Sequence, residues 1–171
     1  MQVAKAIDRR IIPLLLLASC SVERPVFQPT YDRLAGLKYF PPPAKPDLAP
    51  EDTDDEAEIQ FRAAFVFYDT ARWSYAAAAF EEALDYNEDR HDIRFFLASS
   101  LLLANRDIEA ALQCEELFDT PYEMRARALL ARALLRMGKP EEARQAAAPA
   151  APHDYDAAGW LTRFDLLTSS R

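Results

Sequence analysis

The fold is decided by three similar stretches of sequence: "ARWSYAAAAFEEALDYN" (residues 71–87), "NRDIEAALQCEELFDTP" (residues 105–121) and "GKPEEARQAAAPAAPHD" (residues 138–154). Their first residues lie 34 and 33 positions apart. Small or apolar residues recur at fixed distances from each start, in the aligned sets Ala76, Ala110 and Ala143; Phe80, Cys114 and Ala147; and Ala83, Leu117 and Ala150. A constant period of this size predicts a stack of repeated supersecondary units.

The residues before each stretch recur with the same period. They include the pairs Ala63-Ala64, Leu97-Ala98 and Leu130-Ala131, and the bulky residues Phe67, Leu101 and Leu134. Small residues let two helices approach closely, and bulky residues fill the space between them. At the turns, Asn105 and Gly138 tolerate a positive φ, a preference that Ala71 does not share. We therefore expect two helices per unit, joined by a turn at these residues.

This period and these packing positions resemble the tetratricopeptide repeat. The resemblance implies an all-α protein, a short α-solenoid of about three helix pairs with repeats near residues 57–90, 91–123 and 124–157. In "AAGWLTRFDLL", Trp160, Phe164 and Leu167 form one apolar stripe, which predicts a capping helix near residues 155–168 over the open end. The helical domain is expected to occupy residues 51–171.

The start of the first helix carries its own signal. Thr53 followed by Glu56 has the pattern of a capping box, and Asp54 and Asp55 place negative charge at the positive end of the helix dipole. We interpret this acidic cluster as a helix start rather than as a cation site.

The N-terminal sequence predicts a targeting segment. Basic residues precede a short apolar run, residues 11–17, which is too short to span a bilayer as a helix, and small residues follow it. The ending "LASC" resembles the lipobox of bacterial lipoproteins, which implies removal of residues 1–19 and lipidation of Cys20. Several acyl chains on Cys20 would anchor the chain stably to a membrane. Because Ser21, not Asp, follows Cys20, the resemblance implies the outer membrane, with the domain facing the periplasm.

A Pro-rich linker, residues 20–50, separates this anchor from the helical domain. Residues 21–50 contain seven of the twelve prolines, which favours an extended, semi-rigid segment. The linker also contains Phe27, Tyr31, Tyr39 and Phe40, which is more apolar than a spacer requires. This N-terminal arm either docks on the protein's own surface or awaits a partner, and the sequence leaves both alternatives open.

The net charge limits which classes of partner the chain can bind. The chain carries a formal net charge of −8, and removal of residues 1–19 takes away three basic side chains and one acidic one, which leaves about −10. We therefore expect no nucleic-acid partner. With Cys20 lipidated, Cys114 is the remaining cysteine, so no intramolecular disulfide is expected in the mature chain.

In tetratricopeptide domains the inner helix of each pair lines a concave groove, and the resemblance carries this role to particular residues here. The expected partner-binding groove consists of Phe61, Phe65, Tyr68, Phe95, Leu102, Arg125, Arg132 and Arg136. An aromatic half and an arginine half suit a peptide with apolar anchors and an acidic residue or C-terminal carboxylate. The alternative is that some of the aromatics belong to the core and that the arginines form a solvated face.

Catalytic chemistry has little support. The two histidines have no second histidine or cysteine at metal-ligand spacing, Cys114 occupies a packing position, and three glycines do not form a phosphate-binding loop. We expect no enzyme activity, no metal, no cofactor apart from the covalent lipid, and no small-molecule substrate.

These features predict a membrane-anchored scaffold or adaptor lipoprotein that binds a protein or peptide partner in the cell envelope. The resemblance implies a role in assembling an envelope machine, such as a pilus, a secretin or an outer-membrane protein complex. Two alternatives stay open: an adaptor that scaffolds cell-wall enzymes, and a structural subunit that contacts its partners through the Pro-rich arm.

Overall fold

The computed structural model describes residues 35–38, 41–48, 54–150 and 155–168, and this part of the chain is all-helical apart from its turns and one extended segment. The elements are η1 (Ala35–Leu37), α2 (Glu56–Asp69), α3 (Trp73–Tyr86), α4 (His91–Leu103), α5 (Asp107–Glu115), α6 (Glu123–Arg136), α7 (Pro140–Ala147) and α8 (Tyr155–Thr168). The predicted signal segment, the lipidation residue Cys20 and the arm residues Phe27, Tyr31, Tyr39 and Phe40 lie outside the described residues.

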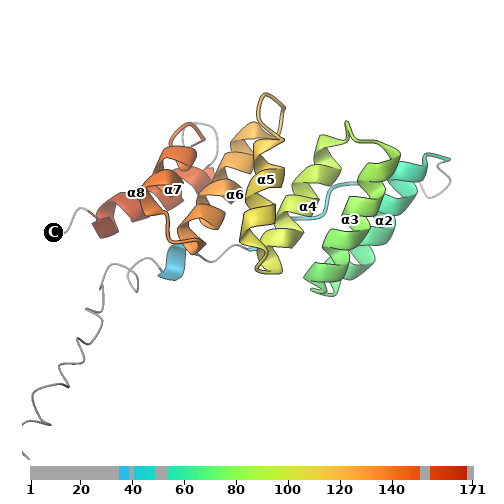
Figure 1. Cartoon of the computed structure of the whole chain (residues 1–171), viewed down its shortest axis with the longest axis horizontal. Coiled ribbons are helices and arrows are strands. Elements are labelled where there is room, and N and C mark those ends of the chain that lie inside the picture. The colour runs from blue at the N-terminus through green and yellow to red at the C-terminus, as the bar shows by residue number, and fades with distance from the viewer. Residues whose placement is uncertain (1–34, 39–40, 49–53, 151–154, 169–171) are drawn as a thin grey trace, which may run out of the picture.

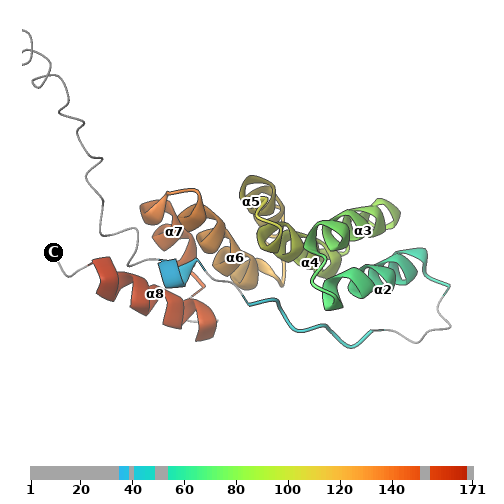
Figure 2. The same cartoon turned by 90° about the horizontal axis from the view of Figure 1, so that it is seen from below.

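The helices form a row in which each one from α2 to α7 packs against its neighbours in sequence, and α4 also contacts α6 (Figure 1). Short turns make successive helices antiparallel. Viewed from below, α3, α5 and α7 lie in one layer and α2, α4 and α6 in the other (Figure 2). The row therefore exposes two different faces, one on each layer.

The same turn closes α2, α4 and α6. Ala71, Asn105 and Gly138 have φ values of 56°, 64° and 80°, in the left-handed region. At each turn this residue donates its N–H to the carbonyl three residues back, and the next residue donates to the carbonyl five residues back. This pair of bonds is the Schellman motif, which satisfies the last carbonyls of a helix. Ala71 adopts the left-handed conformation despite its Cβ, because the motif requires it.

The first helix begins at Glu56, with Asp55 as its N-cap. The Asp55 side chain accepts hydrogen bonds from the N–H groups of Ala57 at 3.1 Å and Glu58 at 3.4 Å. The capping residue is therefore Asp55, two residues beyond the Thr53 that the sequence pattern indicated, and Thr53 itself lies outside the described residues. Either carboxylate or hydroxyl can cap a helix, so the pattern alone did not distinguish these residues.

The core changes in character along the row. Near α2 it is aromatic: the rings of Phe61, Phe65, Phe80 and Phe96 lie 4.9–6.0 Å apart between centroids, mostly edge to face or tilted. Towards α7 it consists of alanine and leucine. All nine residues at the three aligned packing positions in α3, α5, α7 and the turns that follow them are buried, at 0–1% exposure. Six of the nine are alanines, whose small side chains let the two layers approach closely.

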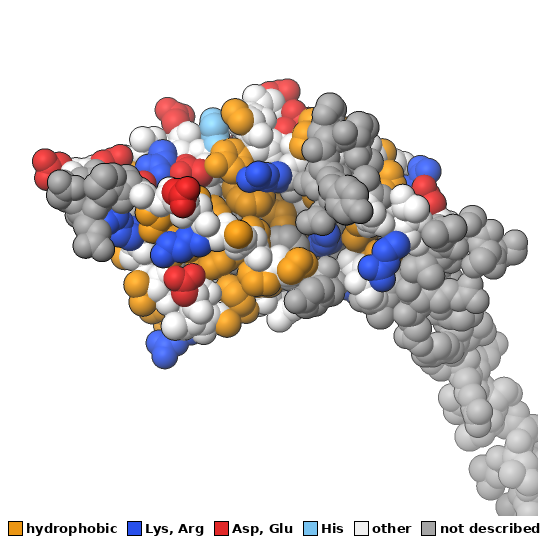
Figure 3. Space-filling model, turned by 180° about the vertical axis from the view of Figure 1, so that it is seen from behind, with side chains coloured by type: hydrophobic (Ala, Val, Ile, Leu, Met, Phe, Trp, Pro, Cys, Tyr) orange, Lys and Arg blue, Asp and Glu red, His pale blue; other side chains and the backbone are white. Residues whose placement is uncertain are grey.

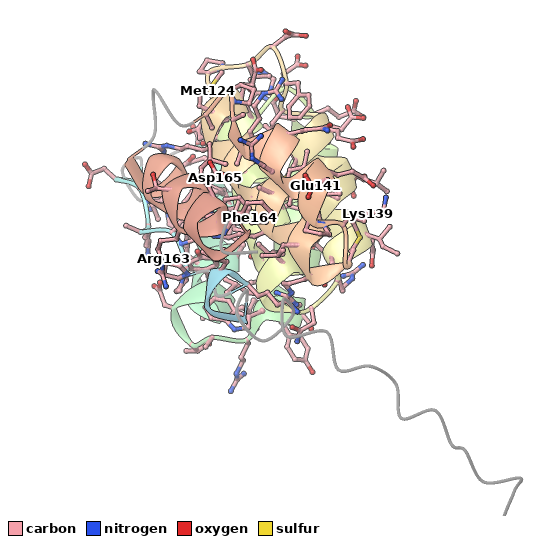
Figure 4. All side chains as sticks on the ribbon, turned by 90° about the vertical axis from the view of Figure 1, so that its left-hand side faces the viewer. Met124, Lys139, Glu141, Arg163, Phe164 and Asp165 are labelled. Carbon is pink, nitrogen blue, oxygen red and sulfur yellow. The ribbon has the colours of Figure 1, made fainter. Side chains whose placement is uncertain are left out.

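One end of the row is closed by α8 and η1. Trp160 and Phe164 on α8 are buried, and Leu37 of η1 packs with them, its carbonyl accepting a hydrogen bond of 2.9 Å from Trp160 Nε1. Figure 4 looks onto this end, with Phe164 pointing from α8 into the molecule. On the outside, Arg144 of α7 bonds Asp165 of α8 at 2.8 Å. A segment from the N-terminal side of the chain thus helps to close its C-terminal end.

Candidate functional site

Residues 41–48, named here the proline segment, lie in an extended conformation along the layer formed by α2, α4 and α6 (Figure 2). The segment starts near the α8 end, where Leu37 is buried, and runs towards α2. Figure 3 shows this face, with apolar side chains gathered across it and Lys and Arg side chains among them. Leu37 and residues 41–48 therefore lie against the protein's own surface, whereas the arm residues for which the two alternatives were left open, Phe27, Tyr31, Tyr39 and Phe40, lie outside the described residues.

Three contacts hold the proline segment to α2. The Tyr68 hydroxyl donates a hydrogen bond of 3.0 Å to the carbonyl of Pro43. Lys45 Nζ lies 3.6 Å from an Asp69 carboxylate oxygen and 5.2 Å from the centroid of the Phe65 ring. Proline has no N–H, so carbonyl oxygens are the backbone groups through which such a segment can bond. Burial, together with the nearby Asp69 charge, raises the pKa of Tyr68, which keeps this donor protonated.

A cavity of about 450 Å³ remains between the proline segment and helices α4 and α6. One wall is the backbone and side chains of residues 41–44 and 46. The other wall consists of Phe95, Phe96, Tyr122, Arg125, Ala128, Leu129 and Arg132. Arginine supplies every charged side chain in this lining, although the whole chain carries a net charge of −8. The cavity therefore combines aromatic walls with positive charge.

Three of the predicted groove residues belong to the core instead. Phe61, Phe65 and Leu102 are 2%, 0% and 0% exposed. Phe61 and Phe65 lie on the inner helix α2, as predicted, and their rings pack against Phe80 of α3 and Phe96 of α4. Phe65 also lies under Lys45 of the proline segment. Because the row is short and only two helices thick, it needs these large side chains to fill its interior. These three side chains are buried and do not line the cavity, which corrects their assignment to the groove; for Phe61 and Phe65 this is the core alternative.

The remaining predicted aromatics border the site. Tyr68 is largely buried, but its hydroxyl reaches the proline segment. Phe95 lines the cavity, with its ring 5.5 Å from that of Tyr122 at an angle of 35° between the planes. Phe95 therefore lines the cavity, and Tyr68 contacts the proline segment through its hydroxyl.

Two of the three predicted arginines line the cavity, and the third does not. Arg125 is exposed and Arg132 is buried, and both line the cavity; Arg132 also donates to the carbonyl of Ala128 at 3.0 Å. Arg136 does not line the cavity. It donates to the Leu102 carbonyl at 2.8 Å, bonds the Asn105 side chain and pairs with Asp107 at 3.1 Å. Arg136 therefore joins α6 to the preceding helix pair, which corrects its assignment to the groove.

Sequence reasoning missed Phe96, Tyr122 and Leu129, and it missed the proline segment as a wall of the cavity. Tyr122 precedes α6 in an irregular connection, where no periodic pattern indicates its direction. Phe96 is adjacent to Phe95, and the alignment assigned only Phe95 to the groove. The run "PPPAKP" could have been recognised as an extended segment, but its position on the inner face depends on contacts distant in sequence.

A charged cluster around Arg90 ties α2 to α4. The guanidinium bonds Asp92 at 2.8 Å and Glu58 at 3.0 Å, and it lies 5.3 Å from the centroid of the Phe61 ring. Its hydrogen bonds to these carboxylates, that to Asp92 most of all, raise the pKa of Arg90. Burial acts to raise the pKa of Asp92, but the hydrogen bond and charge of Arg90 outweigh it and lower that pKa. This cluster is a structural tie.

The described residues offer no metal site: they contain no group of three or more histidine, cysteine or acidic side chains placed to hold an ion. Cys114 is fully buried, and burial raises the pKa of its thiol, which disfavours the nucleophilic thiolate. None of the helices in the described part of the chain has the length and apolar character needed to cross a bilayer.

Comparison with known proteins gives no match to a family model or to a curated protein sequence.

Proposed function

We propose that this chain is a lipid-anchored adaptor of the tetratricopeptide type, which binds a segment of a partner protein in the cavity between its proline segment and helices α4 and α6. The cavity, with its aromatic and arginine lining, is the observation that carries this proposal. The repeated Schellman turns and the buried small residues at a period of 34 and 33 support the tetratricopeptide assignment. The lipobox-like "LASC" supports the anchor.

The cavity indicates the chemistry of the bound segment. Phe95, Phe96 and Tyr122 provide flat apolar walls for one or two apolar side chains. Arg125 at the exposed edge can bond a carboxylate through two N–H groups, which is the geometry that guanidinium favours. A peptide with an apolar residue next to an acidic group or a C-terminal carboxylate is the ligand that fits this lining.

A peptide-binding measurement tests this site. Short peptides ending in an apolar residue are compared by fluorescence anisotropy, each with a free C-terminal carboxylate and as the C-terminal amide. We expect the carboxylate form to bind at least about tenfold more tightly, a difference of about 1.4 kcal/mol. Arg125→Glu should remove this preference.

The matched control is Arg72→Glu, which makes the same charge change at an exposed arginine outside the cavity. It should leave binding unchanged. Equal binding of carboxylate and amide peptides, or equal loss in both variants, would show that the cavity does not select a carboxylate.

The anchor has its own test. Cys20→Ser should leave the chain as an unprocessed precursor, because the thiol that accepts the lipid is absent. Globomycin, which inhibits lipoprotein signal peptidase, should have the same effect on the unaltered chain. Normal maturation in either case would refute lipidation and with it the outer-membrane, periplasm-facing location.

We propose assembly of a pilus, secretin or outer-membrane protein complex as the adaptor's role. The structural-subunit alternative differs from this role, and from an adaptor for cell-wall enzymes, in which part of the chain meets the partner. If the arm is the contact, deleting residues 21–34 while keeping Cys20 should abolish partner capture by crosslinking, and Arg125→Glu should not. If the cavity is the contact, the two variants should give the opposite results.

A further inference from the structure

The proline segment presents one side to the helices, as a bound extended peptide does. Pro43, Pro46 and Leu48 are half-buried, and the other residues of the segment are exposed. An extended proline-rich chain has three residues per turn, so positions three apart fall on the same side. Leu48 in addition packs against the core. The layer of α2, α4 and α6, along which the segment lies in Figure 2, is therefore a surface that binds an extended segment.

Helix α2 holds this segment through groups that recognise a chemical type. The Tyr68 hydroxyl donates to the carbonyl of Pro43, the one backbone hydrogen-bonding group that a proline offers. Lys45 pairs with Asp69 and lies over the ring of Phe65. Aromatic-lined grooves are the surfaces that bind proline-rich segments of other proteins. None of these contacts requires the bound segment to belong to the same chain.

The chain's own segment is held by few contacts and leaves space beneath it. Among the described residues, the Tyr68 bond and the Lys45 ion pair are its polar contacts with the helices, and the side chains of that ion pair are 40% and 55% exposed. Exposed ion pairs stabilise little. Towards α4 and α6 the segment contributes prolines and Ala44, and the cavity of about 450 Å³ remains. A segment with a larger apolar side chain here would bury more surface against Phe95 and Tyr122.

We propose that this face binds an extended, proline-containing segment of a partner protein, which displaces residues 41–48 and places a larger apolar side chain in the cavity. One carbonyl of the partner accepts the hydrogen bond of Tyr68, and a basic residue replaces Lys45 beside Asp69. The proline segment is then a built-in competitor for the partner. This inference rests on the proposed function for the place where the partner binds, and it adds the chemical class of the partner.

A tethered competitor lowers the apparent affinity for the partner. The chain's own segment is always present at a high effective concentration, so the face is open for only a fraction of the time. The apparent dissociation constant of the partner rises as this fraction falls. Loosening the chain's own segment should therefore tighten partner binding, whereas removing a contact to the partner weakens it.

A peptide with the sequence of residues 41–48, PPPAKPDL, tests the proposal by fluorescence anisotropy. It is used as the C-terminal amide, so that its binding does not involve a free carboxylate. We expect it to bind the full chain carrying Lys45→Glu at least about tenfold more tightly than the unaltered chain, because the reversed charge beside Asp69 releases the chain's own segment. The same peptide with Ala44→Leu should bind at least about fivefold more tightly still, because leucine buries three more carbon atoms in the cavity.

Lys139→Glu is the matched control. Lys139 also forms an exposed ion pair, with Glu142 at 3.1 Å, and it does not line the cavity. This variant should bind the peptide as weakly as the unaltered chain does. A peptide that does not bind the Lys45→Glu chain, or that binds all three chains equally, overturns the proposal. If the amide peptide fails in this way while Arg125 still selects a C-terminal carboxylate, the proposed function stands and this inference alone is wrong.

Thiol labelling measures the cover that the segment provides, without any ligand. Ala128 lines the cavity and Ala146 on α7 does not, although their exposed fractions are similar, at 7% and 8%. In a Cys20→Ser background, Lys45→Glu should raise the labelling rate of Ala128→Cys at least about fivefold and leave that of Ala146→Cys unchanged. The buried Cys114 reports unfolding of the whole domain. An unchanged rate at position 128, or an equal rise at positions 128, 146 and 114, overturns the proposal.

Discussion

Ala76 provides a direct test of the repeat register, because it is the first of the three aligned small residues. It lies on α3 between α2 and α4 and has 0% exposure. Ala76→Leu adds three carbon atoms at a point where the helices are already in contact. If space existed for them, burying three such groups would stabilise the fold by up to about 2.4 kcal/mol, at about 0.8 kcal/mol each.

Ala76 is fully buried where α3 packs against α2 and α4, so we expect the added atoms to displace a helix or adopt a strained rotamer. Overpacking of this kind costs about 1–3 kcal/mol. The substitution should therefore lower the free energy of unfolding at a tightly packed position and raise it at a position with unfilled space. For a domain of this size each kcal/mol lowers the melting temperature by roughly 2–8 °C.

The assay is thermal and urea unfolding followed by circular dichroism, with Ala78→Leu as the matched control. Ala78 lies on the same helix two residues away and is exposed, so the same substitution should change the free energy of unfolding by less than about 0.5 kcal/mol. An unchanged or higher melting temperature in Ala76→Leu, or equal losses in the two variants, would refute the packing position and the repeat register built on it.

Two further predictions concern the contacts described above. Tyr68→Phe removes the hydrogen bond to Pro43 and should lower the free energy of unfolding by about 1 kcal/mol, while Lys45→Ala should cost less because its ion pair is largely exposed. Urea titrations that rank them in reverse would contradict this view of the proline segment. Arg90 holds the pKa of Asp92 below its ordinary 3.8, so this carboxylate stabilises the fold above about pH 4, and the gain is lost as the pH falls through the lower, folded-state pKa. Asp92→Asn should make the acid-side fall in stability shallower in titrations from pH 6 to pH 3, and identical slopes would exclude this role.

The sequence predicted an all-helical chain, and the described structure confirms that. The positions of the turns could be predicted because each turn depends on a few adjacent residues. Asn105 and Gly138 favour a left-handed conformation, and the repeat period predicted an equivalent turn at Ala71. The small packing residues could be predicted for a related reason. Helices that pack closely need small residues at a regular spacing, and a regular spacing can be recognised in the sequence.

The candidate site could be predicted only in part. The repeat alignment placed Phe95, Arg125 and Arg132 on the face that lines the cavity, because helical periodicity determines which side of a helix a residue occupies. Periodicity does not determine what covers that side. Phe61 and Phe65 share the inner helix α2 with Tyr68, yet they fill the core while the Tyr68 hydroxyl meets the proline segment.

The sequence by itself determined the helices, their turns and the order in which they stack, since these follow from contacts between residues near one another in the chain. Only the tertiary structure decided the composition of the site. Leu37 meets Trp160 across 123 positions, and Pro43 meets Tyr68 across 25. Such contacts produce no periodic pattern in the sequence, because they join two surfaces that form only after the helices have packed. The tertiary structure therefore decides that the proline segment lines the cavity and that Arg136 links α6 to the preceding helix pair.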